Sequence, residues 1–483
     1  MILSDFTKVL IIIIFFTICL SLRFFYMLES DYGIYFSGSY YFFNSDQTFY
    51  ETVKDFKPPG YYLFLGLIGS FFDWSYFSAY IGYICSIFLF VSSSALIFLK
   101  INKNLNHFIT FIIITSTFMS FLSTNAAIAL FQCSLINICL FFHTRIYNKE
   151  SSEILNIFLS YMFVSFAILS RVDSMIIIPI FLLGTLFFYK DTNIVKIIKY
   201  FFIALIGFLI PFLLLTLLEI SLSDFLFYNF ELAAFYKENY ISKFEYLYKP
   251  KVIEAVSGSA LLFLIPIIFY NAYSVAKTNK NFSHFFAIVG LLFTFLVYFW
   301  IGTDRVYHLL IIFPFLSMVF AIALQNIKKC YSFKVMAISL MVLVVFFQNL
   351  VPNLYATYQK RNDIFNIPIE INELEKFMSH NNIQHIVSGD IKPWFHVLKK
   401  DSNPKLSYFH NLFVFFDFRD SMLTNDFNKL LNTEETKFLI DIGLFDSSIS
   451  TPIMKEIRAK SYTVGEYGDY YIQVISTKPQ YIN

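Results

Sequence analysis

Long uncharged apolar runs recur along most of this chain, and they constrain its fold more than any other feature. Of its 483 residues, 57% are hydrophobic and only 14% are charged. A helix needs about 20 apolar residues to cross a bilayer, and many of these runs reach that length. The sequence therefore predicts a polytopic α-helical membrane protein.

About eleven of the runs are expected to be membrane-spanning helices. They lie near residues 8–28, 75–99, 107–122, 125–145, 154–170, 174–190, 197–220, 256–275, 284–302, 306–325 and 333–351. The apolar stretch 60–72 is too short to span, and the stretch 32–43 is rich in Tyr and Phe, which favour the headgroup layer. We expect both stretches to form interfacial helices.

Loop charges predict the orientation of the spans. If the N-terminus is cytoplasmic, every inside loop carries Lys or Arg, as at Lys100 and Lys103, whereas the outside stretch 29–57 is mainly acidic. This distribution follows the positive-inside rule. We therefore expect a multi-pass protein of the inner (plasma) membrane whose C-terminal tail is periplasmic or extracellular.

The composition changes abruptly after residue 351, where no further spanning run occurs. We expect a transmembrane module at 1–351, with external loops at 29–74 and 221–254, and a soluble extracytoplasmic α/β domain at 352–483. In that domain the pattern predicts helices near 370–380, 425–432 and 452–460, and strands at 384–390, 405–410, 437–445, 462–467 and 470–476.

Several classes of function lack any motif in this sequence. The five cysteines form neither a disulfide framework nor a zinc-ligand spacing. Gly389 stands alone after a predicted strand, without the spaced glycines that cradle the phosphates of NAD or ATP. The net charge of +2 says nothing about partners, because the charges are segregated by loop, and nucleic-acid binding has no support.

Charged groups gather at the expected outer ends of the helices. Polar groups at the hydrocarbon boundary are costly unless paired or solvated, so their shared depth indicates a water-filled cavity. For Arg171 with Asp173 and for Asp304 with Arg305, the alternative is ordinary helix-end charge that is paired and solvated. The groups are Glu29 with Asp31, Arg171 with Asp173, and Asp304 with Arg305, together with Lys57, Tyr307 and His308.

The most informative pairing is that of Asp31 with the turn Lys57-Pro58-Pro59-Gly60-Tyr61-Tyr62. A carboxylate at a membrane surface can take a proton from a hydroxyl, and two prolines fix the angle at which the chain enters the next helix. Arginines at the same surface can bind a phosphate through two hydrogen bonds. Together they suggest an enzyme that acts on lipid-carried substrates.

The order of these parts resembles the GT-C glycosyltransferases, in particular the branch of protein O-mannosyltransferases and the lipid A aminoarabinose transferase. The matching elements are an Asp after the first helix with a Tyr four residues on, a Lys-Pro turn followed by tyrosines, a basic residue at the outer end of the fifth helix, and a basic-aromatic element before the tenth. Here they are Asp31 and Tyr35, Lys57 with Tyr61 and Tyr62, Arg171, and Arg305 with Tyr307 and His308.

The resemblance implies transfer of a sugar from a polyprenyl-phosphate donor to an acceptor hydroxyl, with inversion. Asp31 would be the catalytic base, Arg171 and Arg305 would hold the lipid phosphate, and Lys57 would assist. The remaining substrate-binding candidates are Glu29, Tyr35, Tyr61, Tyr62, Tyr307 and His308. Glu231 and its neighbours in the loop 221–254 would touch acceptor or lipid.

Two positions depart from the family pattern. Tyr32 stands where the acidic neighbour of the catalytic Asp is usual, with Glu29 as a substitute from the other side. Asn125 replaces an Asp that helps some members to bind a metal. A divalent metal is left open but not expected, and no other cofactor is implied.

The acceptor is expected to be a glycan, lipid or protein, with O-antigen, other cell-surface polysaccharide or lipopolysaccharide as examples. A lipid or polysaccharide transporter or flippase is the main alternative, although inverted repeats and midplane charges are not evident. A polysaccharide polymerase or ligase is a second alternative. Such enzymes tend to place function in a large late loop instead of the first one.

Overall fold

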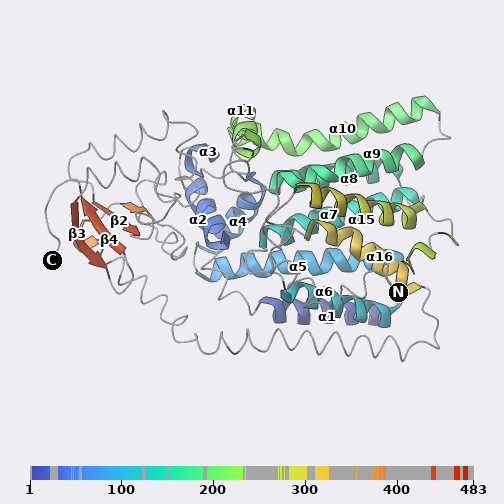
Figure 1. Cartoon of the computed structure of the whole chain (residues 1–483), viewed down its shortest axis with the longest axis horizontal. Helices are drawn as coiled ribbons and strands as arrows, with labels where there is room; N and C mark the ends of the chain where they lie inside the picture. The colour runs from blue at the N-terminus through green and yellow to red at the C-terminus, as the bar shows by residue number, and fades with distance from the viewer. Residues whose placement is uncertain are drawn as a thin grey trace. The chain divides into compact units, whose positions relative to one another are not determined.

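The structure, a computed structural model, shows a helical protein with one small sheet (Figure 1). It describes residues 3–21, 31–44, 46, 48–53, 57–74, 76–121, 127–148, 152–188, 193–231, 234, 270, 272–274, 277, 282–301, 310–325, 355, 373, 376–377, 379–382, 385–387, 437–441, 462–467 and 472–476.

The chain divides into two compact units, which are described separately. The bundle unit comprises Met1–Arg23, Tyr83–Leu217 and Ser242–Ala356. The loop unit comprises Phe24–Gly82, Leu218–Ile241 and Thr357–Asn483.

The bundle unit consists of apolar helices. They are α1 (Leu3–Ser21), α5 (Tyr76–Ile101, which begins in the loop unit), α6 (Leu105–Phe121), α7 (Ala127–Tyr147), α8 (Glu153–Ser170), η3 (Val172–Ile176), α9 (Ile177–Phe188), α10 (Ile194–Leu217), α15 (Phe282–Ile301) and α16 (Phe313–Gln325). Among the described residues, four helices are long and apolar enough to cross a membrane, namely α5, α7, α8 and α10. This finding agrees with a polytopic membrane protein.

Most of the predicted spans coincide with a helix, and two required correction. The expected helix 174–190 begins later than predicted: Arg171 leaves helical geometry at φ −156° and ψ 126°, a 3-10 turn, η3, follows, and α9 begins only at Ile177. Within the expected helix 306–325, the described residues 310–312 form a 3-10 turn and α16 begins at Phe313, with Pro314 in its first turn, a position that a proline tolerates. The predicted spans 256–275 and 333–351 lie mainly outside the described residues.

Helix α8 packs against α7 on one side and α10 on the other (Figure 1). The contact with α10 is close because Gly207 has no side chain: a Cβ there would collide with the backbone carbonyl of Phe158. The Ser165 hydroxyl donates a hydrogen bond to the Phe208 carbonyl, at 2.7 Å. Small residues and polar links of this kind hold helices together where lipid removes the hydrophobic driving force.

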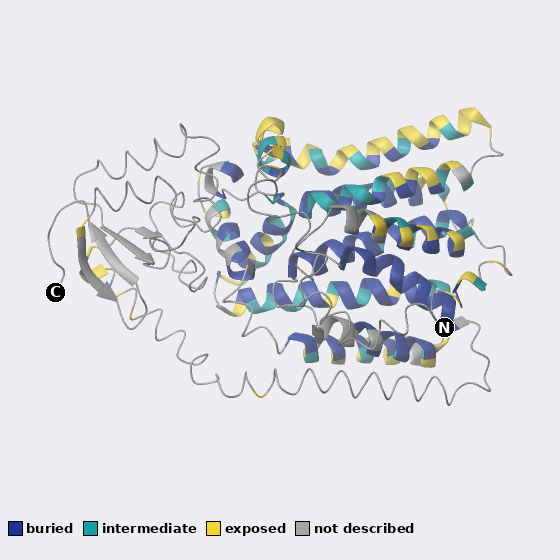
Figure 2. Cartoon of the chain, viewed as in Figure 1, coloured by how far each residue is buried: buried dark blue, intermediate teal, exposed yellow. Residues whose placement is uncertain are grey.

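Burial follows the expected surroundings of the helices (Figure 2). Most residues of α7 are buried, whereas α10 buries one face through residues such as Ala204 and Pro211. Its other face exposes large apolar side chains, including Phe201, Leu205 and Leu213. An exposed apolar stripe on a membrane-spanning helix is the surface that lipid chains cover.

The loop unit contains α2 (Asp31–Phe43), α3 (Phe49–Thr52), α4 (Gly60–Phe71), α11 (Leu222–Leu226) and a π-helical turn, η4 (Phe227–Glu231). Helix α4 has 12 residues, so it is about 18 Å long and too short to cross a hydrocarbon layer of about 30 Å. The prediction that residues 60–72 form a short, non-spanning helix is confirmed in length. Its position at the membrane interface stays a prediction.

A strained turn joins α4 to α5. Asp73 and Trp74 both adopt the left-handed region, at φ 58° and φ 48°, which is uncommon for residues other than glycine. The turn carries the Trp74 ring back over Gly69, where a Cβ would overlap the ring, and against Tyr40 at a centroid distance of 5.3 Å. The strain is therefore balanced by burial of the indole.

The described C-terminal residues include a four-stranded sheet. Its strands are β1 (His385–Val387), β2 (Lys437–Asp441), β3 (Tyr462–Tyr467) and β4 (Ile472–Ser476), in the order β1-β2-β4-β3. The pair β1/β2 is parallel and the other pairs are antiparallel. These strands fall where four of the five strands were predicted; the fifth, 405–410, and the helices 425–432 and 452–460 lie outside the described residues. An extracytoplasmic α/β domain stays a prediction.

Candidate functional site

The Lys-Pro-Pro turn leads directly into α4 and brings four of the predicted site residues together. Pro59 is the residue before the helix, at φ −72°, the value that its ring imposes. The Tyr35 ring lies edge-on to both Tyr61, at 5.6 Å between centroids, and Tyr62, at 5.4 Å. We call Tyr35, Tyr61 and Tyr62 the tyrosine platform.

Lys57 lies above this platform. Its Nζ is 4.8 Å from the centroid of the Tyr35 ring, a distance at which an ammonium is attracted to an aromatic face. Lys57 is half-buried, whereas the three platform rings are at most 1% exposed. The packing of Lys57 against the buried rings therefore fixes the position of the lysine charge.

Asp31 is the first residue of α2 and lies one helical turn before Tyr35. The first turn of a helix stabilises a carboxylate through its unpaired N–H groups. The Asp31 side chain is outside the part of the chain that the structure describes. The same holds for all atoms of Glu29, Asn125, Asp304, Arg305, Tyr307 and His308, whose predicted roles stay predictions.

Tyr32, which replaces the usual acidic neighbour of the catalytic Asp, has a packing role. Its side chain is 1% exposed, and its hydroxyl donates a hydrogen bond of 2.6 Å to the Ala79 carbonyl at the beginning of α5. Gly82 leaves room for that hydroxyl, because a Cβ there would approach it to 2.7 Å. Tyr32 thus joins α2 to the first residues of α5.

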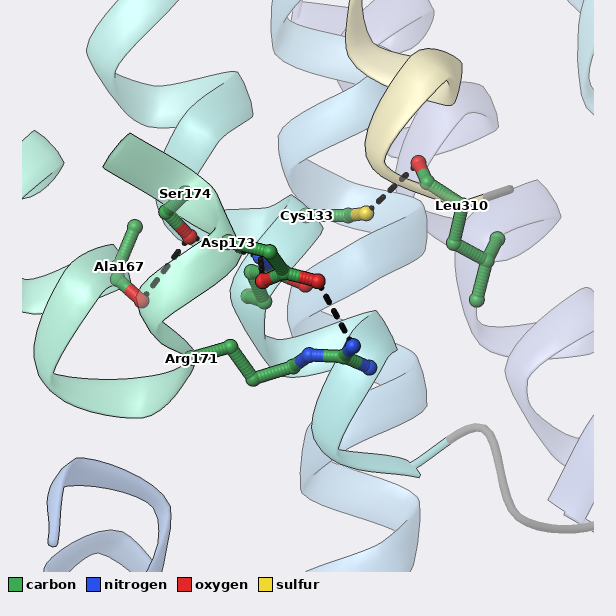
Figure 3. Close-up of polar contacts among 7 residues, drawn as sticks. Cys133, Ala167, Arg171, Asp173, Ser174 and Leu310 are labelled. Carbon is green, nitrogen blue, oxygen red and sulfur yellow. Dashed lines mark hydrogen bonds and ion pairs between the residues drawn. The ribbon is translucent and has the colours of Figure 1, made fainter. Parts of the chain in front are cut away.

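The bundle unit holds a second polar group, at the end of α8 (Figure 3). Arg171 points toward Asp173, and its Nη2 lies 2.7 Å from the carboxylate. The side chains are 11% and 30% exposed, respectively. Arg171 and Asp173 therefore form the ion pair that the sequence analysis gave as the alternative to a functional role. The pair holds the Arg171 guanidinium in a defined place.

Gln132 on α7 completes this group, and the sequence reasoning missed it. Its amide donates to Asp173 at 2.6 Å and to the Ser174 hydroxyl at 2.7 Å, and Ser174 in turn donates to the Ala167 carbonyl at 3.1 Å. The available signal was an amide within an apolar run, since intramembrane polar side chains usually have a partner or a function. We call Arg171, Gln132, Asp173 and Ser174 the arginine cluster.

The opposite end of α8 carries another charged pair. Lys196 lies 3.0 Å from Glu153, the first residue of α8, and the Tyr200 hydroxyl donates to the same carboxylate. Because α8 has 18 residues, this pair and the arginine cluster are about 27 Å apart. That separation is close to the thickness of the hydrocarbon layer of a bilayer, about 30 Å.

The second external loop also contacts the first in a way that the sequence did not predict. The rings of Tyr50 and Tyr228 are stacked, with centroids 4.5 Å apart and planes 2° from parallel. Glu231, named as a contact for acceptor or lipid, is an exposed residue at the end of η4. Asp224, in α11 of the same loop, accepts a hydrogen bond from the Ser221 hydroxyl at 2.6 Å, and the charged residues of the loop after Glu231 lie outside the described residues.

The described side chains form no metal site. Among the described residues, no three His, Cys, Asp or Glu side chains gather closely enough to hold a metal ion. The expectation about a metal therefore stays a prediction. The chemical groups that the structure does assemble are cations, at Lys57 and Arg171, each held by neighbouring side chains.

Comparison with known proteins gives a likeness of fold. No protein-family model matches the sequence, and no curated protein matches it. Among solved structures, the chain is similar to ArnT from Cupriavidus metallidurans, crystallised with bound undecaprenyl phosphate, at a TM-score of 0.62 and 12% sequence identity. The likeness covers 99% of this chain and 98% of that one. The chain is thus a polytopic helical membrane protein with an ArnT-like fold, in agreement with the GT-C-type fold that the resemblance implied.

Proposed function

We propose that this protein is an integral-membrane glycosyltransferase that moves a sugar from a polyprenyl-phosphate donor to an acceptor hydroxyl, with inversion. The observation that carries the proposal is the packing of Lys57 over Tyr35, which lies on the helix that Asp31 begins. The ArnT-like fold supports it, because that ArnT was crystallised with undecaprenyl phosphate. Transfer on the extracytoplasmic face of the inner membrane follows from the predicted orientation.

The proposed reaction gives each residue a part suited to its chemistry. Asp31 takes the proton of the acceptor hydroxyl, and the hydroxyl oxygen forms a bond to the anomeric carbon from the side opposite the phosphate. The bond from that carbon to the phosphate oxygen breaks, and the phosphate leaves with increased negative charge. Arg171 and Arg305 stabilise that charge, which is larger in the transition state than in the bound donor.

Lys57 adds a further positive charge in this scheme. An ammonium held over an aromatic ring stays charged, and the ring interaction itself is worth only about 0.5–2 kcal/mol. The tyrosine platform fixes where that charge lies before the donor arrives, which reduces the cost of ordering it on binding. Direct contacts of Tyr35, Tyr61 and Tyr62 with substrate are not required for this role.

The acceptor class follows from the predicted location. An enzyme with its base at the outer surface of the inner membrane would modify a growing cell-surface glycan, and O-antigen or lipopolysaccharide is the proposed type. Lipid and protein hydroxyls are the other candidates. The proposed C-terminal α/β domain lies on the same side of the membrane and would meet the acceptor first.

The test uses purified protein reconstituted in lipid with a panel of undecaprenyl-phosphate sugars. Release of undecaprenyl phosphate is followed for the wild type, for Asp31→Asn and for the control Asp46→Asn, an exposed carboxylate of the same loop. We expect release by the wild type and the control, and loss of at least about a hundredfold in Asp31→Asn, as for removal of a general base. A fully active Asp31→Asn variant would refute the assignment. Lipid translocation without release from any donor would indicate a transporter instead.

A further inference from the structure

The first and second external loops meet at a compact contact that the proposed reaction does not explain. Its members are Tyr50, which follows Phe49 in α3, and Tyr228 and Asn229, which lie in the π-helical turn η4. The π-helical form is rare and is found mostly as single turns, frequently at functional sites. We call these three residues the loop clasp.

Asn229 is the polar centre of the clasp. Its side chain is 4% exposed, and its Nδ2 donates to the Phe225 carbonyl at 2.8 Å and to the Tyr50 hydroxyl at 2.6 Å. A backbone carbonyl can only accept, so the bond to Phe225 fixes which way the amide points. The amide therefore links the second loop to Tyr50 through a buried hydrogen bond, beside the stacked rings of Tyr50 and Tyr228.

A continuous series of ring contacts leads from the clasp to Lys57. Phe49 contacts Tyr50, with ring centroids 4.9 Å apart, and contacts Tyr62 at 5.2 Å. Tyr62 contacts Tyr35, which lies below the Lys57 ammonium. Phe49 and Tyr62 are both fully buried. Close-packed buried rings have little space to adjust, so a shift of Tyr50 would displace the tyrosine platform.

We propose that Tyr50, Tyr228 and Asn229 are positioning residues, which fix the second external loop to the tyrosine platform and thereby hold Lys57 in place for the phosphate of the lipid donor. The inference rests on the proposed function, since it names a lipid phosphate as the ligand of Lys57. It goes further by assigning a role to the beginning of the second loop.

The experiment measures binding of undecaprenyl phosphate to the full protein in lipid. Tyr50→Phe removes the acceptor of the amide but keeps the stacked ring, and Asn229→Leu removes both donated hydrogen bonds at similar volume. Each should raise the Kd on the order of fivefold, equal to about 1 kcal/mol, the usual net contribution of one hydrogen bond. The double variant should bind no more weakly than Asn229→Leu. The bond from Asn229 to the Tyr50 hydroxyl, which Tyr50→Phe removes, is already absent in Asn229→Leu.

Two controls separate positioning from general damage. Leu226→Ala alters an exposed side chain of the same segment and should change the Kd by less than about twofold. In a Lys57→Met background, Asn229→Leu should have no further effect on the Kd, because the clasp acts through the lysine. Loss of folded protein with an unchanged Kd would assign the clasp a structural role only and overturn the inference.

The outcomes distinguish this inference from the proposed function. If the wild type binds undecaprenyl phosphate and the two clasp variants bind it equally well, the clasp is refuted and the glycosyltransferase proposal is unaffected. If Asn229→Leu weakens binding equally with and without Lys57, the route through the lysine is wrong. If the wild type does not bind the lipid at all, both proposals fail together.

Discussion

Replacing Gln132 by leucine tests how the arginine cluster is held. The substitution keeps the side-chain volume but removes the hydrogen bonds to Asp173 and Ser174. A bond to a charged group contributes about 1.5–3 kcal/mol and one to a neutral group about 0.5–1.5 kcal/mol, which gives an upper bound of about 4.5 kcal/mol. Polar links between membrane helices average only about 0.6 kcal/mol each, which gives a lower bound of about 1 kcal/mol.

The exposure of the partners decides between these bounds. The Asp173 side chain is 30% exposed, so water can replace part of the lost bond, whereas Ser174 is fully buried and keeps its bond to Ala167. We therefore expect Gln132→Leu to lower the free energy of unfolding by about 2 kcal/mol. The control is Ser134→Ala, two residues further along α7, whose hydroxyl bonds to the Leu130 carbonyl of its own helix.

The assay uses the buried cysteines of the same helix. Cys133 and Cys139 are both 0% exposed, so a thiol-reactive fluorophore reaches them only after the bundle opens. Unfolding in increasing SDS is followed by this labelling, in a background where Cys19, Cys85 and Cys330 are replaced by serine. If Gln132→Leu costs no more than Ser134→Ala, the amide does not hold the cluster and the reasoning is refuted.

Two further predictions concern packing. Gly207→Val should destabilise the protein by about 1–3 kcal/mol, because its side chain would collide with the Phe158 backbone, which cannot move aside as a side chain can. Ile206→Val, on the exposed face of α10, is the control in the same SDS titration, and equal effects of the two would contradict the close contact. Tyr32→Phe should cost about 1 kcal/mol by removing the bond to Ala79 and should speed amide hydrogen exchange in α2. Unchanged exchange rates there would show that this bond does not stabilise α2.

Hydropathy predicted the helices of the bundle unit because apolar runs of this length have few other structures available to them. The Lys-Pro-Pro turn was equally informative, since proline fixes φ and places Tyr61 and Tyr62 in the first turn of α4. The contact of both rings with Tyr35 was not predicted. Nothing in the spacing along the chain determines it.

The missed contacts depend on positions that are distant in sequence. Gln132 and Asp173 meet because α7 and α8 pack together, and a single sequence does not encode which faces of two apolar helices will meet. Asn229 and Tyr50 are separated by several helices, so no local pattern joins them. The later beginning of α9 was missed because residues 172–176 form a 3-10 turn after the extended backbone of Arg171, which pairs with Asp173 two residues later.

The charged groups at the two ends of α8 also make this protein sensitive to the thickness of its bilayer. The helix is about 27 Å long, so a bilayer of that hydrocarbon thickness leaves both the Glu153 pair and the arginine cluster in the headgroup layers. A thicker bilayer would have to thin locally or draw one group toward its core, at a cost of a fraction of a kcal/mol per Å. The lipid chain length chosen for reconstitution therefore acts directly on the position of Arg171, and short-chain lipids match it best.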